Sequence, residues 1–171
     1  MKKDISLKII ILIIITTIIV GLAIFFREDH FVPENEYTYE TDMFSTVNVK
    51  GALKLFENLD KASFLFIGRQ YCQGCAYQGP ILQIALAEYQ FPVYYLDLNT
   101  IDTSKEETQE LLKKLDFEYE LYDKKGPFGS FLGYTPMLII IKGGKQVYGH
   151  IGALDKDEIY ELILKYGVIT E

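Results

Sequence analysis

An uncharged hydrophobic run at residues 9–26 is the strongest pattern near the start of the chain. At about 1.5 Å of rise per residue, a helix of this length nearly matches a hydrocarbon core of roughly 30 Å. Lysines precede the run and acidic residues dominate the segment after it, so the positive-inside rule predicts a cytoplasmic N-terminus. We therefore expect a cytoplasmic segment at residues 1–8 and a single transmembrane signal anchor at residues 9–26, with the remaining chain outside the cell membrane.

A cleaved secretory signal is the main alternative, because Gly21 and Ala23 are small residues that suit a cleavage site. The hydrophobic run continues beyond them through Phe26, where a processed chain usually turns polar. A buried helix of a soluble protein is the third interpretation, and a run that is apolar on every side disfavours it. No cysteine lies near the run, which excludes lipid attachment as a lipoprotein.

Residues 27–43 are polar and acidic and lack clear periodicity, which is typical of a tether between an anchor and a folded domain. The first 26 positions hold 3 of the 17 Lys and Arg residues and 1 of the 24 Asp and Glu residues. The rest of the chain therefore has 14 basic and 23 acidic residues, a net charge of −9. An acidic exterior disfavours nucleic acid and anionic lipid surfaces as partners.

Helical and strand patterns alternate from residue 47 onward. A helical spacing comes first, at Leu53, Phe56 and Leu59. Two apolar strands come next, at residues 63–68 and 92–98, and between them residues 75–89 carry a helical set of apolar positions. Strand, helix and strand in this order predict a β-α-β unit, which is normally parallel and right-handed.

The second half of the chain predicts another helix, an irregular segment and a hairpin. Thr103 or Ser104 can cap the helix, with Glu106 or Glu107 completing a capping box and an apolar face at Leu111, Leu112 and Leu115. Residues 123–134 hold three glycines and a proline, which predict irregular structure. Two strands, at residues 137–142 and 145–151, are joined by Gly143-Gly144, a pair that favours a tight hairpin.

A final helix is predicted after Asp155, which can serve as its N-cap. Its buried face would consist of Ile159, Leu162, Ile163 and Tyr166. Together the elements predict an α/β fold in which helices cover both faces of a mixed sheet.

The only two cysteines, Cys72 and Cys75, lie between the first strand and the next helix, in R-Q-Y-C-Q-G-C-A-Y-Q-G-P. A C-x-x-C pair beside a β-α-β unit is typical of thiol redox chemistry. At the start of a helix, free backbone N–H groups and the positive end of the dipole favour the thiolate of Cys72. Cys75, one turn later, can attack the mixed disulfide that Cys72 makes with a substrate.

Two other interpretations of the cysteine pair are weaker. A zinc site needs about four ligands, and the chain has two cysteines and two histidines, of which His30 lies in the predicted tether. A purely structural disulfide across two residues closes too short a loop to stabilise the fold much through chain entropy. We therefore predict a redox pair, with neither metal nor cofactor.

Residues from about 44 to 168 resemble the thioredoxin superfamily. Pro80 stands five residues after the second cysteine, where thioredoxins carry a helix-kinking proline, and Y-T-P-M is similar to the loop whose proline is cis. The ending G-H-I-G-A-L-D also resembles that of thioredoxins. The resemblance implies a thioredoxin-like three-layer α/β/α fold with a mixed central sheet over residues 44–171, plus an insertion around residues 101–131.

The resemblance also implies roles for individual residues. Cys72 would be the nucleophile and Cys75 the resolving cysteine; the substrate-binding residues would be Tyr71, Gln73, Gly74, Thr135 and Pro136. In the family, the residue before the cis proline faces the disulfide and presents its backbone to substrate. Plainer alternatives stay open: Pro136 as an ordinary trans proline, and Thr135 as a β-branched residue in an extended segment.

Several positions depart from the thioredoxin pattern. Thioredoxins carry a buried aspartate where this chain has Phe66. Either the proton of Cys75 passes to water or to a nearby group such as Glu88, Glu118 or Asp97, or the transfer is slower. Tyr71 replaces a tryptophan. Gln73-Gly74 offers no charge to stabilise a thiolate, which argues against a strong oxidase and leaves the direction of electron transfer open.

Aromatic residues of the insertion have two open interpretations. They would either shape a peptide groove or pack in the core, and they are Phe117, Tyr119, Phe128 and Phe131. Further along the chain, His150 is expected to be a half-exposed residue of the last strand.

The segment F-I-G-R-Q-Y-C-Q-G-C is similar to that of bacteriocin transport accessory proteins, small thioredoxin-like proteins of Gram-positive bacteria. We therefore expect a membrane-tethered extracytoplasmic thiol-disulfide oxidoreductase, reductase/isomerase-like or disulfide-forming, that acts on exported proteins or peptides. A membrane electron donor or acceptor would be its redox partner. The alternative is a non-catalytic accessory or scaffold component of a peptide export, bacteriocin or conjugation apparatus.

Overall fold

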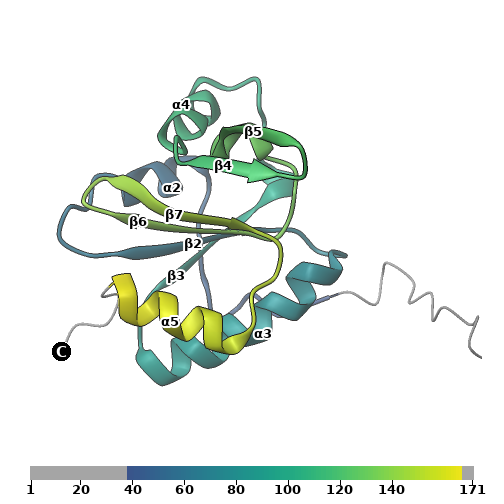
Figure 1. Ribbon diagram of the computed structural model, residues 1–171, viewed down its shortest axis with the longest axis vertical. Coiled ribbons are helices and arrows are strands. Elements are labelled where there is room, and N and C mark those ends of the chain that lie inside the picture. Colours follow the sequence, from purple (N-terminus) through teal and green to yellow (C-terminus); the bar gives the residue numbers. More distant parts are fainter. Residues whose placement is uncertain (1–37, 167–171) are drawn as a thin grey trace, which may run out of the picture. The chain divides into compact units, whose positions relative to one another are not determined.

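The structure is a computed structural model that describes residues 38–166 (Figure 1). The predicted cytoplasmic segment, the anchor, His30 and most of the tether lie outside the described residues. Between residues 38 and 166, no helix is both long enough and apolar enough to span a bilayer.

A five-stranded mixed sheet forms the centre of the domain, in the order β1-β3-β2-β6-β7. Its strands are β1 (Ser45–Thr46), β2 (Ser63–Gly68), β3 (Val93–Asp97), β6 (Met137–Lys142) and β7 (Lys145–Ile151). β1, β3 and β2 run parallel, whereas β6 is antiparallel to β2 and β7 is antiparallel to β6. The parallel pair β2–β3 with the helix between them confirms the predicted β-α-β unit.

Helices cover both faces of this sheet (Figure 1). α3 (Gln73–Tyr89) and α5 (Lys156–Tyr166) pack on one face, and α2 (Val49–Leu55) and α4 (Glu106–Lys114) pack on the other. The central strand β2 shows why: Phe64 and Phe66 enter the core with α3 and α5, while Leu65 and Ile67 enter the core with α2 and α4. A strand that is apolar at every position suits a sheet buried on both sides.

Tyr39, in the segment predicted to be a tether, is buried against the folded domain. It is only 8% exposed, and its ring centroid lies 5.9 Å from that of Phe66 and 6.1 Å from that of Tyr95. The ring packs on α3 at Gly79, where an added Cβ would lie 2.7 Å from its Cδ2 atom. Tyr39 therefore packs with the domain, although it lies before residue 44. Its ring can be buried there because Gly79 has no side chain in its way.

Two helix predictions differ from the structure. α2 ends at Leu55, so Leu59 lies beyond it and is 67% exposed; the side chain of Asn58 instead accepts the N–H groups of Asp60 and Lys61 in a turn. α4 begins after Lys105 without a side-chain cap. Ser104 lies one residue before the N-cap position, and its hydroxyl donates to Asp102 at 2.7 Å.

The predicted irregular segment at residues 123–134 is partly wrong. It contains β5 (Lys124–Pro127), which pairs with β4 (Glu118–Leu121) in a separate two-stranded sheet, and the short helix η3 (Phe128–Phe131). Local glycines and a proline predict breaks in structure, whereas strand pairing in this hairpin depends on a partner segment.

The other two turn predictions are confirmed. Gly143 and Gly144, between β6 and β7, both have positive φ angles, of 60° and 75°. At the start of α5 the side chain of Asp155 accepts the N–H of Glu158, while the carboxylate of Glu158 accepts the N–H of Asp155. This reciprocal pair is a capping box.

The insertion packs against the second face of the sheet. Its fully buried side chains, Leu111, Leu115 and Phe128, belong to the same core cluster as Leu65 and Ile67. Phe128 lies over Gly149 of β7, where an added Cβ would meet its ring carbons at 2.7 Å. The insertion aromatics therefore serve the core: Phe128 and Phe131 are buried, and Phe117 and Tyr119 pack partly buried against it.

Substitution of Gly149 by Ala tests this packing. We expect a loss of about 1–3 kcal/mol in the free energy of unfolding, because a rigid ring and the strand must move apart to admit a methyl group. Urea unfolding of the full-length chain in detergent measures the loss. Gly126→Ala is the matched control, since the nearest atom to its added Cβ is the Ser130 hydroxyl at 3.3 Å. Equal stability of the two variants would contradict the packing.

Alkaline pH tests the burial of Tyr39. Its hydroxyl donates to that of Tyr95 at 3.1 Å, and burial raises the pKa of both phenols above the ordinary value of about 10. The neutral phenols stabilise the fold fully below pH 10, and this contribution falls above pH 10 because only the unfolded chain ionises. For Tyr39 we expect the loss to approach about 1.4 kcal/mol per pH unit as pH rises above 10.

The comparison of Tyr39→Phe with wild type isolates this effect in urea unfolding between pH 10 and pH 11. The variant should show the shallower dependence of stability on pH. Tyr122→Phe, at a position that is 82% exposed, should keep the wild-type dependence. Identical slopes for Tyr39→Phe and wild type would mean that Tyr39 is not buried as described.

Candidate active site

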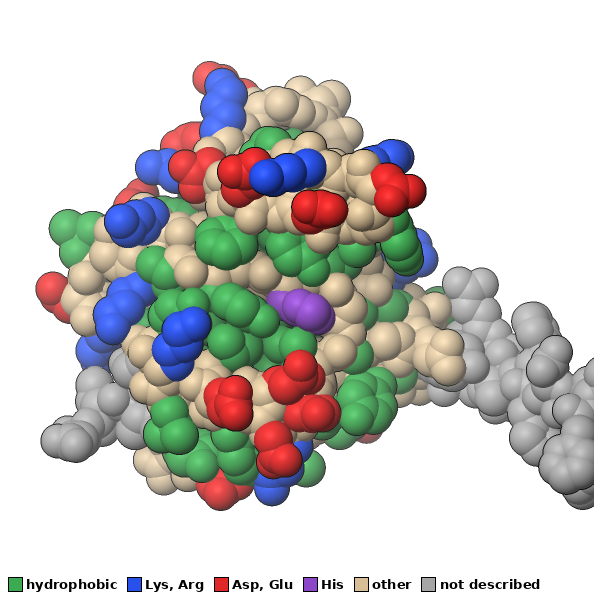
Figure 2. All heavy atoms as spheres, in the orientation of Figure 1, with side chains coloured by type: hydrophobic (Ala, Val, Ile, Leu, Met, Phe, Trp, Pro, Cys, Tyr) green, Lys and Arg blue, Asp and Glu red, His purple; other side chains and the backbone are tan. Residues whose placement is uncertain are grey.

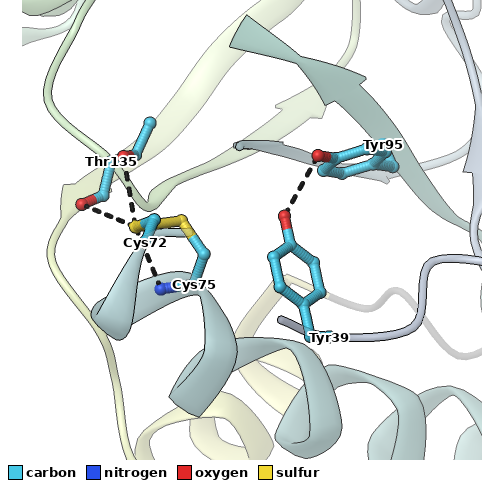
Figure 3. Close-up of a disulfide and its surroundings, with 5 residues drawn as sticks. All are labelled: Tyr39, Cys72, Cys75, Tyr95 and Thr135. Carbon is cyan, nitrogen blue, oxygen red and sulfur yellow. Dashed lines mark hydrogen bonds between the residues drawn. A yellow bond between two sulfur atoms is a disulfide. The ribbon is translucent and has the colours of Figure 1, made fainter. Parts of the chain in front are cut away.

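Cys72 and Cys75 lie where β2 leads into α3 and form a disulfide (Figure 3). Cys72 is the N-cap residue of α3, and its Sγ atom accepts the backbone N–H of Cys75 at 3.2 Å. Cys72 is 8% exposed, whereas Cys75 is fully buried. An incoming thiol or disulfide can therefore reach Cys72 and not Cys75.

Thr135 lies directly against the sulfur of Cys72 (Figure 3). Its hydroxyl donates to Sγ at 3.2 Å, and its carbonyl oxygen lies 3.6 Å from the same atom. The Thr135–Pro136 peptide bond is cis, which confirms the conformation that the resemblance implied. A hydroxyl donor aimed at Sγ stabilises negative charge on that atom more than it stabilises a neutral thiol.

Strand pairing brings the two segments together. β2 and β6 are antiparallel neighbours with Ile67 opposite Met137, so the end of β2 and the start of β6 lie at the same edge of the sheet. The N–H of Gly152, just after β7, donates to the carbonyl of Pro136 at 2.9 Å and fixes the loop from the other side.

Gly74 has a packing role in addition to its predicted place in the substrate site. An added Cβ at Gly74 would lie 2.7 Å from the Cδ atom of Pro136. The absence of a side chain therefore lets the first turn of α3 approach the proline closely. Pro80 lies further along α3, which continues through it to Tyr89.

The remaining predicted substrate residues lie on the surface beside Cys72. Tyr71 is 51% exposed and adopts a left-handed backbone conformation with φ of 60°, and Gln73 is exposed at the first position of α3. Tyr134, which precedes Thr135, is also exposed. Tyr134 was not among the predicted substrate residues, although its place two residues before the predicted cis proline could have pointed to it.

None of the three candidate carboxylates hydrogen-bonds to a cysteine sulfur. Glu88 accepts the hydroxyl of Tyr160, Glu118 pairs with Lys125 at 3.2 Å, and Asp97 accepts the N–H of Asn99 at the start of η2 (Leu98–Thr100). Over residues 38–166, the buried polar side chains include no carboxylate; they are Ser63, Gln78, Thr108 and Gln146. The described interior thus offers no acidic group to accept the proton of Cys75.

Phe66, at the position where thioredoxins carry an aspartate, belongs to an aromatic cluster. Its ring centroid lies 5.8 Å from that of Phe44 and 5.6 Å from that of Tyr95, and Tyr39 completes the cluster. These aromatic side chains and Cys75 belong to the same hydrophobic core, in which the hydroxyls of Tyr39 and Tyr95 are hydrogen-bonded to each other.

Gln78 is a buried polar residue that the sequence patterns did not single out. It lies one helical turn after Cys75 on α3, and residues three apart share a helix face. Its Oε1 atom accepts the N–H of Leu154 at 2.6 Å, while Nε2 has no hydrogen-bond partner within the described part of the chain. A glutamine three positions after a cysteine, within an apolar helix face, was the signal available in the sequence.

His150 lies on β7 opposite Leu138 and takes no part in the cysteine contacts. It is half-buried, and burial lowers its pKa, so the ring is neutral at pH 7. The one histidine of residues 38–166 shows at the surface between hydrophobic side chains (Figure 2). The expectation of a half-exposed strand residue is confirmed.

Comparisons with known proteins find structures with a similar fold and no match among family models or curated proteins. One similar structure concerns the thiol-resolving mechanism of a yeast mitochondrial 1-Cys peroxiredoxin via glutathione/thioredoxin systems. Its TM-score is 0.52 at 12% identity, over 74% of this chain and 99% of that chain.

A second similar structure is a mutant thioredoxin from Halobacterium salinarum NRC-1. Its TM-score is 0.50 at 15% identity, over 74% of this chain and 95% of that chain. The narrower resemblance to bacteriocin transport accessory proteins stays a prediction. At these identities the likeness concerns the fold alone, and the domain has the thioredoxin-like α/β fold that its sequence resemblance implied.

Proposed function

We propose that this protein is a thiol-disulfide oxidoreductase in which Cys72 exchanges disulfides with a substrate and Cys75 resolves the mixed disulfide. The contacts of the Cys72 sulfur carry this proposal. Sγ receives the N–H of Cys75 and the hydroxyl of Thr135, both at 3.2 Å, at the N-terminus of a 17-residue helix. Hydrogen-bond donors and the positive end of the helix dipole favour the thiolate, which is the attacking species.

Reduction of a substrate proceeds in two exchanges. The Cys72 thiolate attacks one sulfur of the substrate disulfide, whose S–S bond breaks; the released substrate thiolate takes up a proton. Cys75, as its thiolate, then attacks Sγ of Cys72, and the second substrate sulfur leaves. Two electrons have passed to the substrate, and the Cys72–Cys75 disulfide has formed. The reverse sequence oxidises two substrate thiols.

Water is the acceptor that we assign to the proton of Cys75. The buried side chains of residues 38–166 include no carboxylate, and the free amide group of Gln78 gives an entering water a hydrogen-bond donor. Ionisation of a buried thiol in these surroundings is costly, because burial disfavours the charged form. The second exchange is therefore the slower one, and the mixed disulfide on Cys72 is the species that should accumulate.

The substrate we propose is an exported protein or peptide in extended conformation. The backbone of Thr135 lies beside the reactive sulfur, and the exposed side chains of Tyr71, Gln73 and Tyr134 surround it. The hydrophobic run at residues 9–26 supports a membrane tether with the domain outside the cytoplasm, and a membrane electron donor or acceptor would then restore the cysteine pair.

Trapping of the mixed disulfide tests the proposal. The full-length Cys75→Ala variant, reduced and mixed with insulin, should form a covalent adduct that non-reducing gels resolve and dithiothreitol releases. The Cys72→Ala variant should form none, because its remaining cysteine is buried. In the coupled assay, wild type should accelerate insulin reduction by dithiothreitol, and both variants should fall to the uncatalysed rate. Absence of both adduct and acceleration would favour a scaffold without redox activity.

A further inference from the structure

Tyr119 of β4 connects the inserted hairpin to segments that lead to the cysteine site. Its hydroxyl accepts the backbone N–H of Ile151 at 3.1 Å, at the end of β7. Its ring makes edge-to-face contacts with the rings of Phe128 and Phe131, at centroid distances of 5.1 and 5.9 Å. Tyr119 therefore joins the hairpin, η3 and the last strand of the main sheet.

A first route runs from the Tyr119 hydroxyl to Pro136. Ile151, whose N–H this hydroxyl binds, lies opposite Met137 in the β6–β7 pair. The next residue, Gly152, donates its N–H to the carbonyl of Pro136 at 2.9 Å. Two hydrogen bonds from adjacent peptide groups thus connect the hairpin to the proline that comes after Thr135.

A second route runs from the Tyr119 ring to Tyr134. Phe131, which the Tyr119 ring contacts, lies 6.5 Å from the ring of Tyr134, and its carbonyl accepts the N–H of Tyr134 at 3.2 Å. Both routes therefore end on the residues that flank Thr135. Between them, the Thr135 hydroxyl donates to the sulfur of Cys72 at 3.2 Å.

We propose that Tyr119 is a positioning residue that holds the Tyr134–Pro136 loop so that Thr135 donates to Cys72. This inference rests on the redox function proposed above and adds a group from the insertion to its machinery. A hydrogen bond to Sγ stabilises the thiolate and hence the reduced form. Loss of the positioning contact should raise the pKa of the Cys72 thiol and shift the cysteine pair toward the disulfide.

The change in the redox equilibrium of the cysteine pair should correspond to the free energy of one weakened hydrogen bond. For Tyr119→Phe, which keeps the ring and removes the hydroxyl, we expect a roughly threefold to tenfold change in the equilibrium with glutathione. At 29.6 mV per tenfold change, this lowers the reduction potential by about 15–30 mV. Tyr119→Ala removes both routes and should shift the equilibrium further in the same direction.

The experiment equilibrates the full-length chain in detergent with glutathione buffers, alkylates the free thiols and measures the reduced fraction by mass. Tyr122→Phe, in the turn of the same hairpin and 82% exposed, is the control and should match wild type. The same variants are alkylated with iodoacetamide across a pH series to obtain the pKa of Cys72. A merely structural role for Tyr119 would lower the melting temperature and leave both quantities unchanged.

A double variant shows whether the effect passes through Thr135. In the Thr135→Val background, which lacks the hydroxyl donor, Tyr119→Phe should no longer change the equilibrium or the pKa. The inference is overturned if folded Tyr119→Phe matches Tyr122→Phe, or if its full shift persists in the Thr135→Val background. Failure of the wild-type pair to exchange with glutathione would instead overturn the redox function itself.

Discussion

The hydrogen bond from the Thr135 hydroxyl to the sulfur of Cys72 connects residues that are 63 positions apart, and the sheet determines whether they meet. β2 ends just before Cys72, and β6 begins just after Pro136. Antiparallel pairing of these two strands, with Ile67 opposite Met137, places both segments at one edge. A shift of one residue in this register would move the donor away from the sulfur and turn every side chain of the strand to the opposite face.

The same arrangement makes the two sulfurs unequal. Cys72 occupies the N-cap of α3, at the surface, whereas Cys75 lies one turn further along and is enclosed by the core. The fold thus supplies stabilising donors to the more accessible sulfur and apolar surroundings to the buried one, as the proposed exchange reactions require. Phe66 contributes to this difference, because an aromatic ring occupies a position where a carboxylate could accept the proton of Cys75.

Much of this site could be predicted from local sequence patterns. The helix start at the cysteines, the strands on either side and the turn at Gly143-Gly144 depend on periodicity and backbone preferences that neighbouring residues reveal. The cis conformation of Pro136 was implied by the resemblance to thioredoxins and is confirmed.

Other features depend on partners distant in the sequence, and no local pattern reveals them. Burial of Tyr39 depends on the space that Gly79, which has no side chain, leaves on α3. The unpaired Nε2 group of Gln78 is apparent only from the structure, in which Oε1 accepts the N–H of Leu154. The hairpin of β4 and β5 arises where glycine and proline predict a break, and the contact of Tyr119 with Ile151 crosses 32 residues. Ser104 is a residue type that often caps helices. In this structure its hydroxyl instead donates a hydrogen bond to the side chain of Asp102.

We infer that the fold stabilises a thiolate on Cys72 and disfavours ionisation of Cys75. Alkylation of the reduced full-length chain with iodoacetamide across pH 4 to 10, with each cysteine assigned by peptide mass, tests it directly. Cys72 should react with a pKa below the ordinary thiol value of about 8.5, while Cys75 should stay unmodified over the same period. A pKa of 8.5 or above for Cys72, or equal reaction of both cysteines, would contradict it.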